Sequence, residues 1–162
     1  MKLVMILVLV VACTYVGRGF SNHYVLRHSF FNELLMFFNK LNLDINFSRE
    51  KLKPIIASYT SQSKELSIIL KNFLEAIEEK KVDENKLFSG TRLLTQDEKN
   101  TLLAFFSSLG RFDLLGQTNQ INNFVKQFET TIKQTSADKE KYGTLFTKLG
   151  LIIGVVISLI LL

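Results

Sequence analysis

Apolar residues are arranged along this chain in two different ways. Residues 3–17 and 149–162 contain no charged side chain, and apart from Lys2 every charged residue lies between them. In the middle of the chain, apolar positions recur every three or four residues, as they do on one face of a helix. The pattern therefore predicts a helical domain with a membrane-inserted segment at each end.

The first apolar segment is expected to be a transmembrane helix covering residues 1–20. Its charge-free stretch is about 15 residues long, or roughly 22 Å of helix, against a hydrocarbon core of about 30 Å. The gap closes if Lys2 reaches back to the interface and the helix continues to Phe20. The alternative is that residues 10–13, Val-Val-Ala-Cys, are a lipoprotein cleavage box, so that an acylated Cys13 becomes the first residue and the domain lies outside the cell.

The second apolar segment predicts a transmembrane helix at residues 142–162, about 31 Å long at 1.5 Å per residue. Small residues recur in it at spacings of three or four and fall on one face, and two of them form the GxxxG pattern that lets membrane helices approach closely. These residues are Gly143, Thr147, Gly150, Gly154 and Ser158. We expect this face to contact the first segment or another subunit; the alternative is the ordinary occurrence of glycine in membrane helices.

The central domain, residues 21–141, is predicted to be all helical. The first helix continues to about Leu43 and is followed by a short helix at 48–59, an amphipathic helix at 61–81 and a short helix or turn at 83–88. Thr95 and Glu98 form a capping box that starts the next helix, which ends at Gly110. The last helix is expected to begin beyond Gly116 and to continue unbroken into the membrane.

The fold class is therefore all-α, a compact antiparallel helical bundle flanked by an N-terminal and a C-terminal transmembrane helix. The apolar stripes expected to form its core are Leu26, Phe30, Leu34, Phe37, Phe38 and Leu41; Leu52, Ile55, Ile56 and Tyr59; Leu66, Ile69, Leu70, Phe73, Leu74 and Ile77; Leu102, Leu103, Phe105, Phe106 and Leu109; and Ile121, Phe124, Val125, Phe128 and Ile132.

The net charge of +5 changes this picture only at the membrane boundary. Acidic residues are interleaved with the basic ones, and no concentrated basic patch of the kind that binds phosphate is present, which argues against nucleic acid as a partner. Basic residues flank the inner ends of both apolar segments, as the positive-inside rule requires for a cytoplasmic central domain. Arg18, Arg27, Lys139, Lys141 and Lys148 are the main examples.

The sequence contains no constellation that indicates an enzyme. A phosphate-binding loop, a paired-cysteine site and a zinc-protease motif are all missing. The two histidines, His23 and His28, lie five residues apart and so do not share a helix face as ligands four residues apart would. We expect no catalytic residue, no cofactor and no metal.

With these features in place, the chain resembles the stage III sporulation protein AB family along its whole length. The more specific shared residues are Leu109, Gly110, Asp113 and Gln117, then Lys139, Lys141, Leu149, Gly150 and Gly154 with the apolar tail. Weaker ones are Val10, Val11 and Ala12, then Leu41, Asp44, Ile45, Phe47 and Leu52. The chain differs from the family at Cys13, Tyr15 and Asp44, where threonine, tryptophan and glutamate would be expected.

The resemblance implies a structural subunit of the channel complex that joins mother cell and forespore in endospore-forming bacteria. It implies a location in the outer forespore membrane on the mother-cell side, with a cytoplasmic domain similar to the F-type platform proteins of type II secretion. Such platforms couple a cytoplasmic ATPase, here stage III sporulation protein AA, to membrane components of the channel; a homo-oligomer is an additional expectation.

By analogy with platform proteins, the ATPase would contact two turns of the domain, because loops carry binding residues more often than core faces do. The candidate residues are Lys80, Lys81, Lys86, Arg111, Asp113 and Gln117. The alternative is that both turns are simply solvated and that Asp113 caps the last helix. Two other functions stay open, namely the acylated surface protein described above and a membrane adaptor with an unrelated soluble partner.

Overall fold

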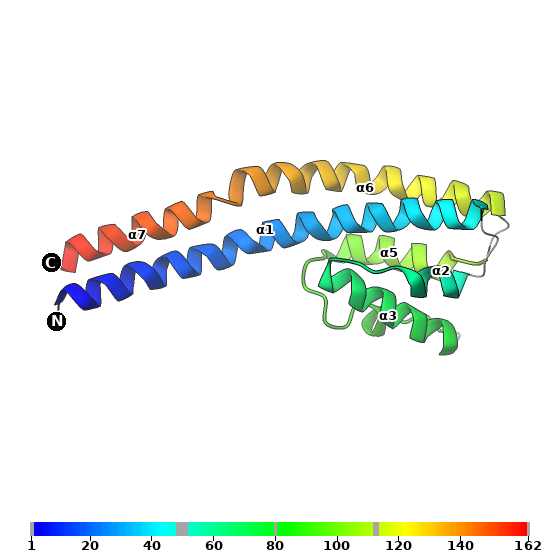
Figure 1. The fold of residues 1–162 in the computed structure, drawn as a ribbon, viewed down its shortest axis with the longest axis horizontal. Helices are drawn as coiled ribbons and strands as arrows, with labels where there is room; N and C mark the ends of the chain where they lie inside the picture. Colours follow the sequence, from blue (N-terminus) through cyan, green and yellow to red (C-terminus); the bar gives the residue numbers. More distant parts are fainter. Residues whose placement is uncertain (1, 48–51, 80, 112–113, 162) are drawn as a thin grey trace. The chain divides into compact units, whose positions relative to one another are not determined.

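The computed structural model describes residues 2–47, 52–79, 81–111 and 114–161, and within them all regular structure is helical, with no strand (Figure 1). The helices are α1 (Lys2–Phe47), α2 (Leu52–Ser58), α3 (Lys64–Glu79), α4 (Glu84–Leu87), α5 (Gln96–Ser108), α6 (Leu114–Tyr142) and α7 (Leu145–Leu161). The prediction of an all-helical chain is confirmed.

Contacts divide the chain into two units. Unit 1 consists of Met1–His28 and Lys133–Leu162, and unit 2 consists of Ser29–Ile132. Unit 1 is larger than the two expected membrane segments at residues 1–20 and 142–162. It also contains the polar residues 21–28, which follow the first segment, and 133–141, which precede the second.

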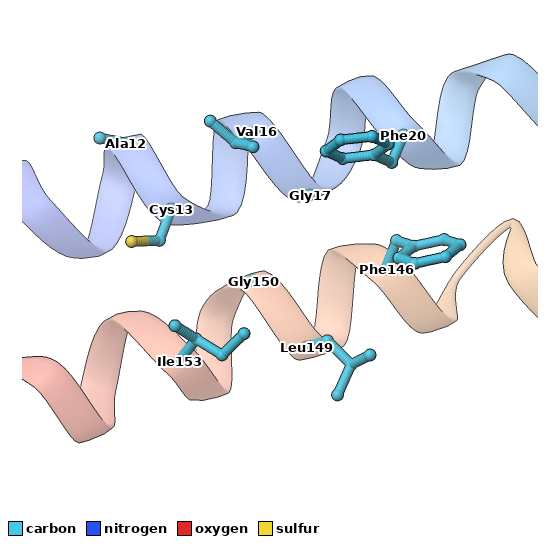
Figure 2. Close-up of a pocket in the computed structure, with 9 residues that line it drawn as sticks. All are labelled: Ala12, Cys13, Val16, Gly17, Phe20, Phe146, Leu149, Gly150 and Ile153. Atoms are coloured by element: carbon cyan, nitrogen blue, oxygen red, sulfur yellow. The ribbon is translucent and has the colours of Figure 1, made fainter.

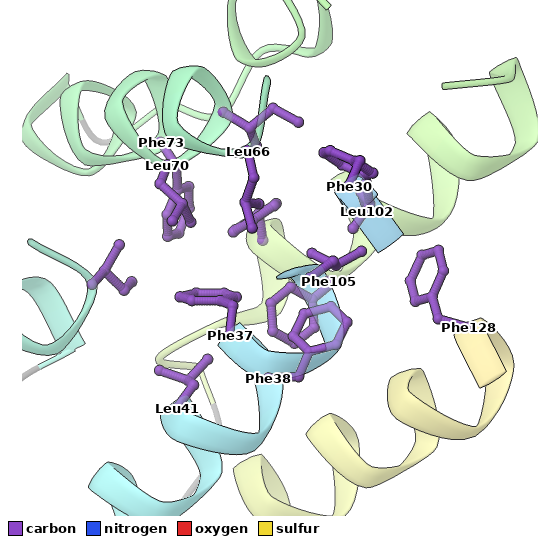
Figure 3. Packing of buried hydrophobic residues seen from close by; sticks show 14 of the residues in the cluster. Phe30, Phe37, Phe38, Leu41, Leu66, Leu70, Phe73, Leu102, Phe105 and Phe128 are labelled. Atoms are coloured by element: carbon purple, nitrogen blue, oxygen red, sulfur yellow. The ribbon is translucent and has the colours of Figure 1, made fainter. Parts of the chain in front are cut away.

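Unit 2 is organised around phenylalanine side chains. Phe38 of α1 and Phe105 of α5 are fully buried, with their ring centroids 4.6 Å apart, and Phe105 also lies 5.0 Å from Phe124 of α6. Phe73 of α3 packs 4.6 Å from Phe106 of α5. Figure 3 shows Phe38, Phe73 and Phe105 within the same cluster of buried side chains. Each such ring removes a large apolar surface from water, so this cluster supplies most of the packing of the unit.

The stripes expected from the sequence account for most of this core. Phe30, Leu34, Phe37, Phe38 and Leu41 of α1 are buried, as are the first four predicted residues of the α3 stripe. Leu26 was expected in the same stripe, but it belongs to unit 1 and is 48% exposed. Phe31 and Ile45, which the stripe did not include, are buried instead.

The helix ends follow local signals. Thr95 accepts from the backbone N–H of Glu98 while the Glu98 carboxylate accepts from the backbone N–H of Thr95, which confirms the predicted capping box. α5 ends at Ser108, and Gly110 follows with a φ of +80°, a left-handed conformation that glycine adopts without strain. Asp83 caps α4 by accepting from the N–H groups of Asn85 and Lys86.

Four predicted boundaries were wrong, the first being the end of α1, which is at Phe47 and not at about Leu43. α3 begins at Lys64, not Ser61, because Ser61 and Ser63 form a turn of their own before the helix. α6 begins at Leu114 and includes Gly116, which was expected to precede it. The helix does not continue unbroken to the end, because a turn at Gly143 and Thr144 separates α6 from α7.

A buried carboxylate that the sequence did not reveal joins α1 to the connection between α2 and α3. Glu33 is 8% exposed, and its Oε2 accepts from the Ser61 hydroxyl and the Gln62 backbone N–H, each at 3.2 Å. The Tyr59 hydroxyl donates to the Glu33 carbonyl oxygen at 3.2 Å. Burial and the nearby Glu33 charge raise the pKa of Tyr59 to about 12.

Candidate functional site

The glycines of α7 contact α1 backbone to backbone within unit 1. A Cβ at Gly150 would lie 2.6 Å from the carbonyl oxygen of Cys13 and 3.3 Å from the Cα of Gly17. A Cβ at Gly154 would lie 3.0 Å from the Cα of Val10. Since real Cβ atoms essentially never approach closer than 3.0 Å, the spacing of the two helices at Gly150 depends on the absence of a side chain.

The other small residues of the predicted face are placed less uniformly. Ser158 is buried and donates to the carbonyl oxygen of Gly154 at 2.7 Å, which satisfies its hydroxyl within α7. Thr147 is half-buried. Gly143 lies in the turn before α7, where its carbonyl oxygen accepts a hydrogen bond from the Ser21 hydroxyl of α1.

Gly17 was not part of the predicted face, yet a Cβ at this position would collide with the carbonyl oxygen of Phe146. The sequence shows Gly17 only as the small residue that ends the first charge-free segment, because its contact with α7 depends on the register of the two helices. By contrast, Gly19, two residues further along α1, has no heavy atom within 4 Å of where its Cβ would be.

An apolar cavity of about 500 Å³ lies beside this glycine contact (Figure 2). Its lining is Ala12, Cys13, Val16, Gly17 and Phe20 of α1 with Phe146, Leu149, Gly150 and Ile153 of α7. The cavity contains no charged group and no acid–base pair, so its chemistry is that of an apolar packing surface.

Four aromatic rings meet at the polar end of the glycine contact. Tyr24 lies 5.1 Å from Tyr142 and is stacked 5.8 Å from Phe146, and Phe20 lies 6.0 Å from Phe146. Aromatic residues gather in this way where a membrane helix leaves the hydrocarbon, since a ring has an apolar body and tyrosine adds a polar hydroxyl.

Beyond the aromatic rings the helix pair becomes polar. The Nδ1 of His28 lies 3.5 Å from the hydroxyl of Thr135, which is buried. Burial lowers the pKa of His28, and the positive charge of Lys139 lowers it further, so this ring is neutral at pH 7. Lys141 extends over the ring of Tyr142, with its Nζ 5.0 Å from the centroid.

Within the described residues, one helical stretch, Leu115–Ile160, is long and apolar enough to cross a membrane. Its apolar part is α7, whose 17 residues span about 26 Å. Large apolar side chains cover the outside of this helix, with Ile152, Ile153 and Leu159 each at least half exposed, which suits a lipid environment.

The two turns expected to contact a partner lie at one end of unit 2. A Cβ at Gly110 would be 3.1 Å from a methyl group of Leu52, at the start of α2. The next residue, Lys53, pairs with Glu78 near the end of α3, with Nζ and Oε1 2.6 Å apart. The start of α2 therefore lies next to both the turn after α5 and the turn after α3.

The candidate contact residues differ in exposure. Lys81 and Arg111 are exposed, and Gln117 is half-buried in α6. Lys86 forms an ion pair with Glu79, with Nζ and Oε1 2.5 Å apart, and the hydrogen bond to that carboxylate raises the pKa of Lys86. Lys80 and Asp113 lie outside the described residues. Lys81 and Arg111 are thus exposed charges, one in each of the two turns.

No group of three or more metal-ligating side chains occurs in the part of the chain that the structure describes. The candidate sites are two surfaces, namely the glycine-lined helix contact of unit 1 and the end of unit 2 that carries Lys81 and Arg111.

A family model for stage III sporulation protein AB matches residues 2–162. Neither the comparison with curated proteins nor the comparison with solved structures finds a match.

Proposed function

The chain belongs to the stage III sporulation protein AB family, and from this membership we propose that it is a non-enzymatic platform subunit of the channel between mother cell and forespore. In this role the central helical domain is cytoplasmic, on the mother-cell side, and couples the ATPase stage III sporulation protein AA to membrane components. The observation that carries the proposal is the family match over essentially the whole chain.

The geometry of unit 1 supports an N-terminal membrane helix beside α7. A single helix in lipid has no need of a backbone contact as close as the one between Gly150 and Cys13, whereas two adjacent membrane helices gain packing from it. The aromatic rings of Phe20, Tyr24 and Tyr142 then lie at the level where both helices leave the membrane. Both anchors would enter from the cytoplasmic side, in keeping with the basic residues at their inner ends.

The same contact argues against the lipoprotein alternative. Cleavage before Cys13 would remove Val10, whose Cα faces Gly154, and would leave the outer half of α7 without its neighbour. Acylation of Cys13 would also place a lipid on a side chain that faces α7, since the Cys13 Cβ lies 3.3 Å from where a Cβ at Gly154 would be.

The ATPase contact is proposed at the end of unit 2 that presents Lys81 and Arg111. Exposed charges on two turns that lie near one helix start can steer a protein partner and orient it, while contributing little to the fold of the domain. Glu78 and Glu79 at the same place are already paired with Lys53 and Lys86, so the acidic end of α3 is partly neutralised.

The test is capture of the ATPase by the full-length chain in membranes solubilised with mild detergent. We expect the wild-type chain to retain stage III sporulation protein AA, and a double variant, Lys81→Glu with Arg111→Glu, to lose it. The matched control is Lys64→Glu with Lys126→Glu, which reverses two exposed charges elsewhere in unit 2.

Wild-type chain that is membrane-embedded but retains no ATPase would overturn the platform proposal and leave an adaptor with another partner. Equal loss in the control variant would overturn the assignment of the contact to these two turns.

A further inference from the structure

The net charge of the chain is confined to one unit. Unit 1 contains seven Lys and Arg residues and two Asp and Glu residues, whereas unit 2 contains thirteen of each. The whole excess of +5 therefore belongs to the helix pair, and unit 2 is neutral overall. Charge that serves only solubility would not be expected to follow this division.

Within unit 1 the charges are also confined along the helices. α1 has no charged residue from Leu3 to Gly17, and α7 has none after Lys148. The register of the helix pair is fixed by the contacts of Gly17 with Phe146 and of Gly150 with Cys13. Arg18 and Lys148, each next to one of these contacts, therefore mark the polar limit of both apolar segments at nearly the same level.

The basic residues at this level and just beyond it form what we call the collar, Arg18, Lys139, Lys141 and Lys148, all of them exposed. Two acidic residues lie in the same region, Asp138, half-buried, and Glu140, exposed, and they leave the collar with a clear positive excess. His28 adds no charge at pH 7, for the reasons given above.

One residue of the collar, Arg18, lies in a groove. A groove of about 520 Å³ on α1 is lined by Tyr15, Arg18, Gly19, Ser21, Asn22 and Val25. It is open because Gly19 has no side chain and no heavy atom fills the space next to it. The guanidinium of Arg18 and the amide of Asn22 are donors suited to a phosphate oxygen, and the apolar members suit the glycerol and acyl parts of a lipid.

We propose that the collar binds the headgroups of anionic phospholipids, with the groove at Arg18 as one defined position. Basic residues next to a membrane helix attract anionic lipid, each by about 1 kcal/mol, or about fivefold. The aromatic rings of Tyr24 and Tyr142 place the collar at headgroup depth. The inference rests on the membrane placement in the proposed function and is independent of the ATPase.

The test uses the full-length chain in a neutral detergent, titrated with phosphatidylglycerol or with phosphatidylcholine of the same acyl chains, with bound lipid counted by native mass spectrometry. We expect phosphatidylglycerol to bind at least about tenfold more tightly, since several collar residues act together. The variant Arg18→Gln with Lys141→Gln and Lys148→Gln should lose this preference. The matched control, Lys64→Gln with Lys71→Gln and Lys126→Gln, removes three exposed charges from unit 2 and should keep it.

Equal affinity of the wild-type chain for the two lipids would overturn the proposal while leaving the platform function intact. Loss of the preference in the control would also overturn it, because the effect would then depend on net charge alone. Displacement of the lipid by excess inorganic phosphate would overturn the lipid assignment in favour of a free anion. A wild-type chain that does not sediment with membranes at all would contradict both this proposal and the platform function.

Discussion

Replacement of Gly150 with alanine would introduce a Cβ 2.6 Å from the carbonyl oxygen of Cys13. Ordinary van der Waals contact for a Cβ begins at 3.4 Å, and distances below 3.0 Å essentially do not occur. The carbonyl oxygen of Cys13 is a backbone atom that cannot rotate away, so α1 and α7 have to separate by about 0.4–0.8 Å. A gap of this size forfeits roughly a quarter to a half of each contact energy along the interface.

Two terms decide the size of the effect. Overpacking of this kind costs about 1–3 kcal/mol, whereas replacing glycine by alanine in a helix contributes about 0.8–1.0 kcal/mol of stability in water. Gly19→Ala is the matched control, because Gly19 is on the same pair of helices and its Cβ would meet nothing within 4 Å. The control gains only the helix stability that alanine adds over glycine. The difference in stability between the two variants therefore measures the cost of overpacking.

The assay is thermal unfolding of the full-length chain in detergent, followed by the near-ultraviolet circular dichroism of the packed rings of Tyr24 and Tyr142. A chain of this length shifts by about 2–4 °C per kcal/mol, so Gly150→Ala should melt roughly 2–12 °C below Gly19→Ala. Far-ultraviolet helicity below the transition should be the same in both variants. A Gly150→Ala protein as stable as the control would refute the inference that α1 and α7 touch at this glycine.

Three further predictions concern unit 2. The folded-state pKa of Tyr59 is raised to about 12, from an ordinary value near 10. The stability that depends on the neutral phenol is therefore complete below pH 10 and is lost as pH rises through 12. Absorbance titration at high pH should show a late-ionising tyrosine that the Tyr59→Phe variant lacks. Phe105→Ala should lower the free energy of unfolding by about 3–5 kcal/mol, because the ring is fully buried among three others, and a urea-unfolding loss below 1 kcal/mol, about the scale of a surface substitution, would contradict the core described here. Thr95→Ala should cost about 0.5–2 kcal/mol in the same assay, and no change would mean that the capping box contributes nothing to α5.

The helices of unit 2 could be predicted because local signals and periodicity agree there. The capping box at Thr95, the glycine after α5 and the apolar stripe of α3 each follow from residues within one or two helical turns. These signals do not depend on which other part of the chain packs against them.

What could not be predicted depends on partners distant in sequence. Glu33 is a charged residue beside the apolar stripe of α1, and its position alone indicates an exposed side chain. Only the fold brings Tyr59, Ser61 and Gln62 to its oxygen atoms. Likewise the close contact at Gly17 depends on the register between α1 and α7, which one sequence does not specify. The interruption at Gly143 also escaped prediction, since a single glycine in a helical pattern does not by itself end a helix.

In the proposed function, an uncleaved N-terminal helix packs in the membrane against α7. The most direct test uses the native Cys13 with one new cysteine, Gly154→Cys, because a Cβ at position 154 would lie 3.3 Å from the Cβ of Cys13, close to the roughly 3.5–4.5 Å found in disulfides. After mild oxidation in membranes, trypsin should release peptides 3–18 and 149–162 joined to each other, and a Val156→Cys control, on an exposed part of α7, should release them separately. Absence of the linked peptide from the Gly154→Cys protein, or recovery of Cys13 as an acylated first residue, would contradict the account.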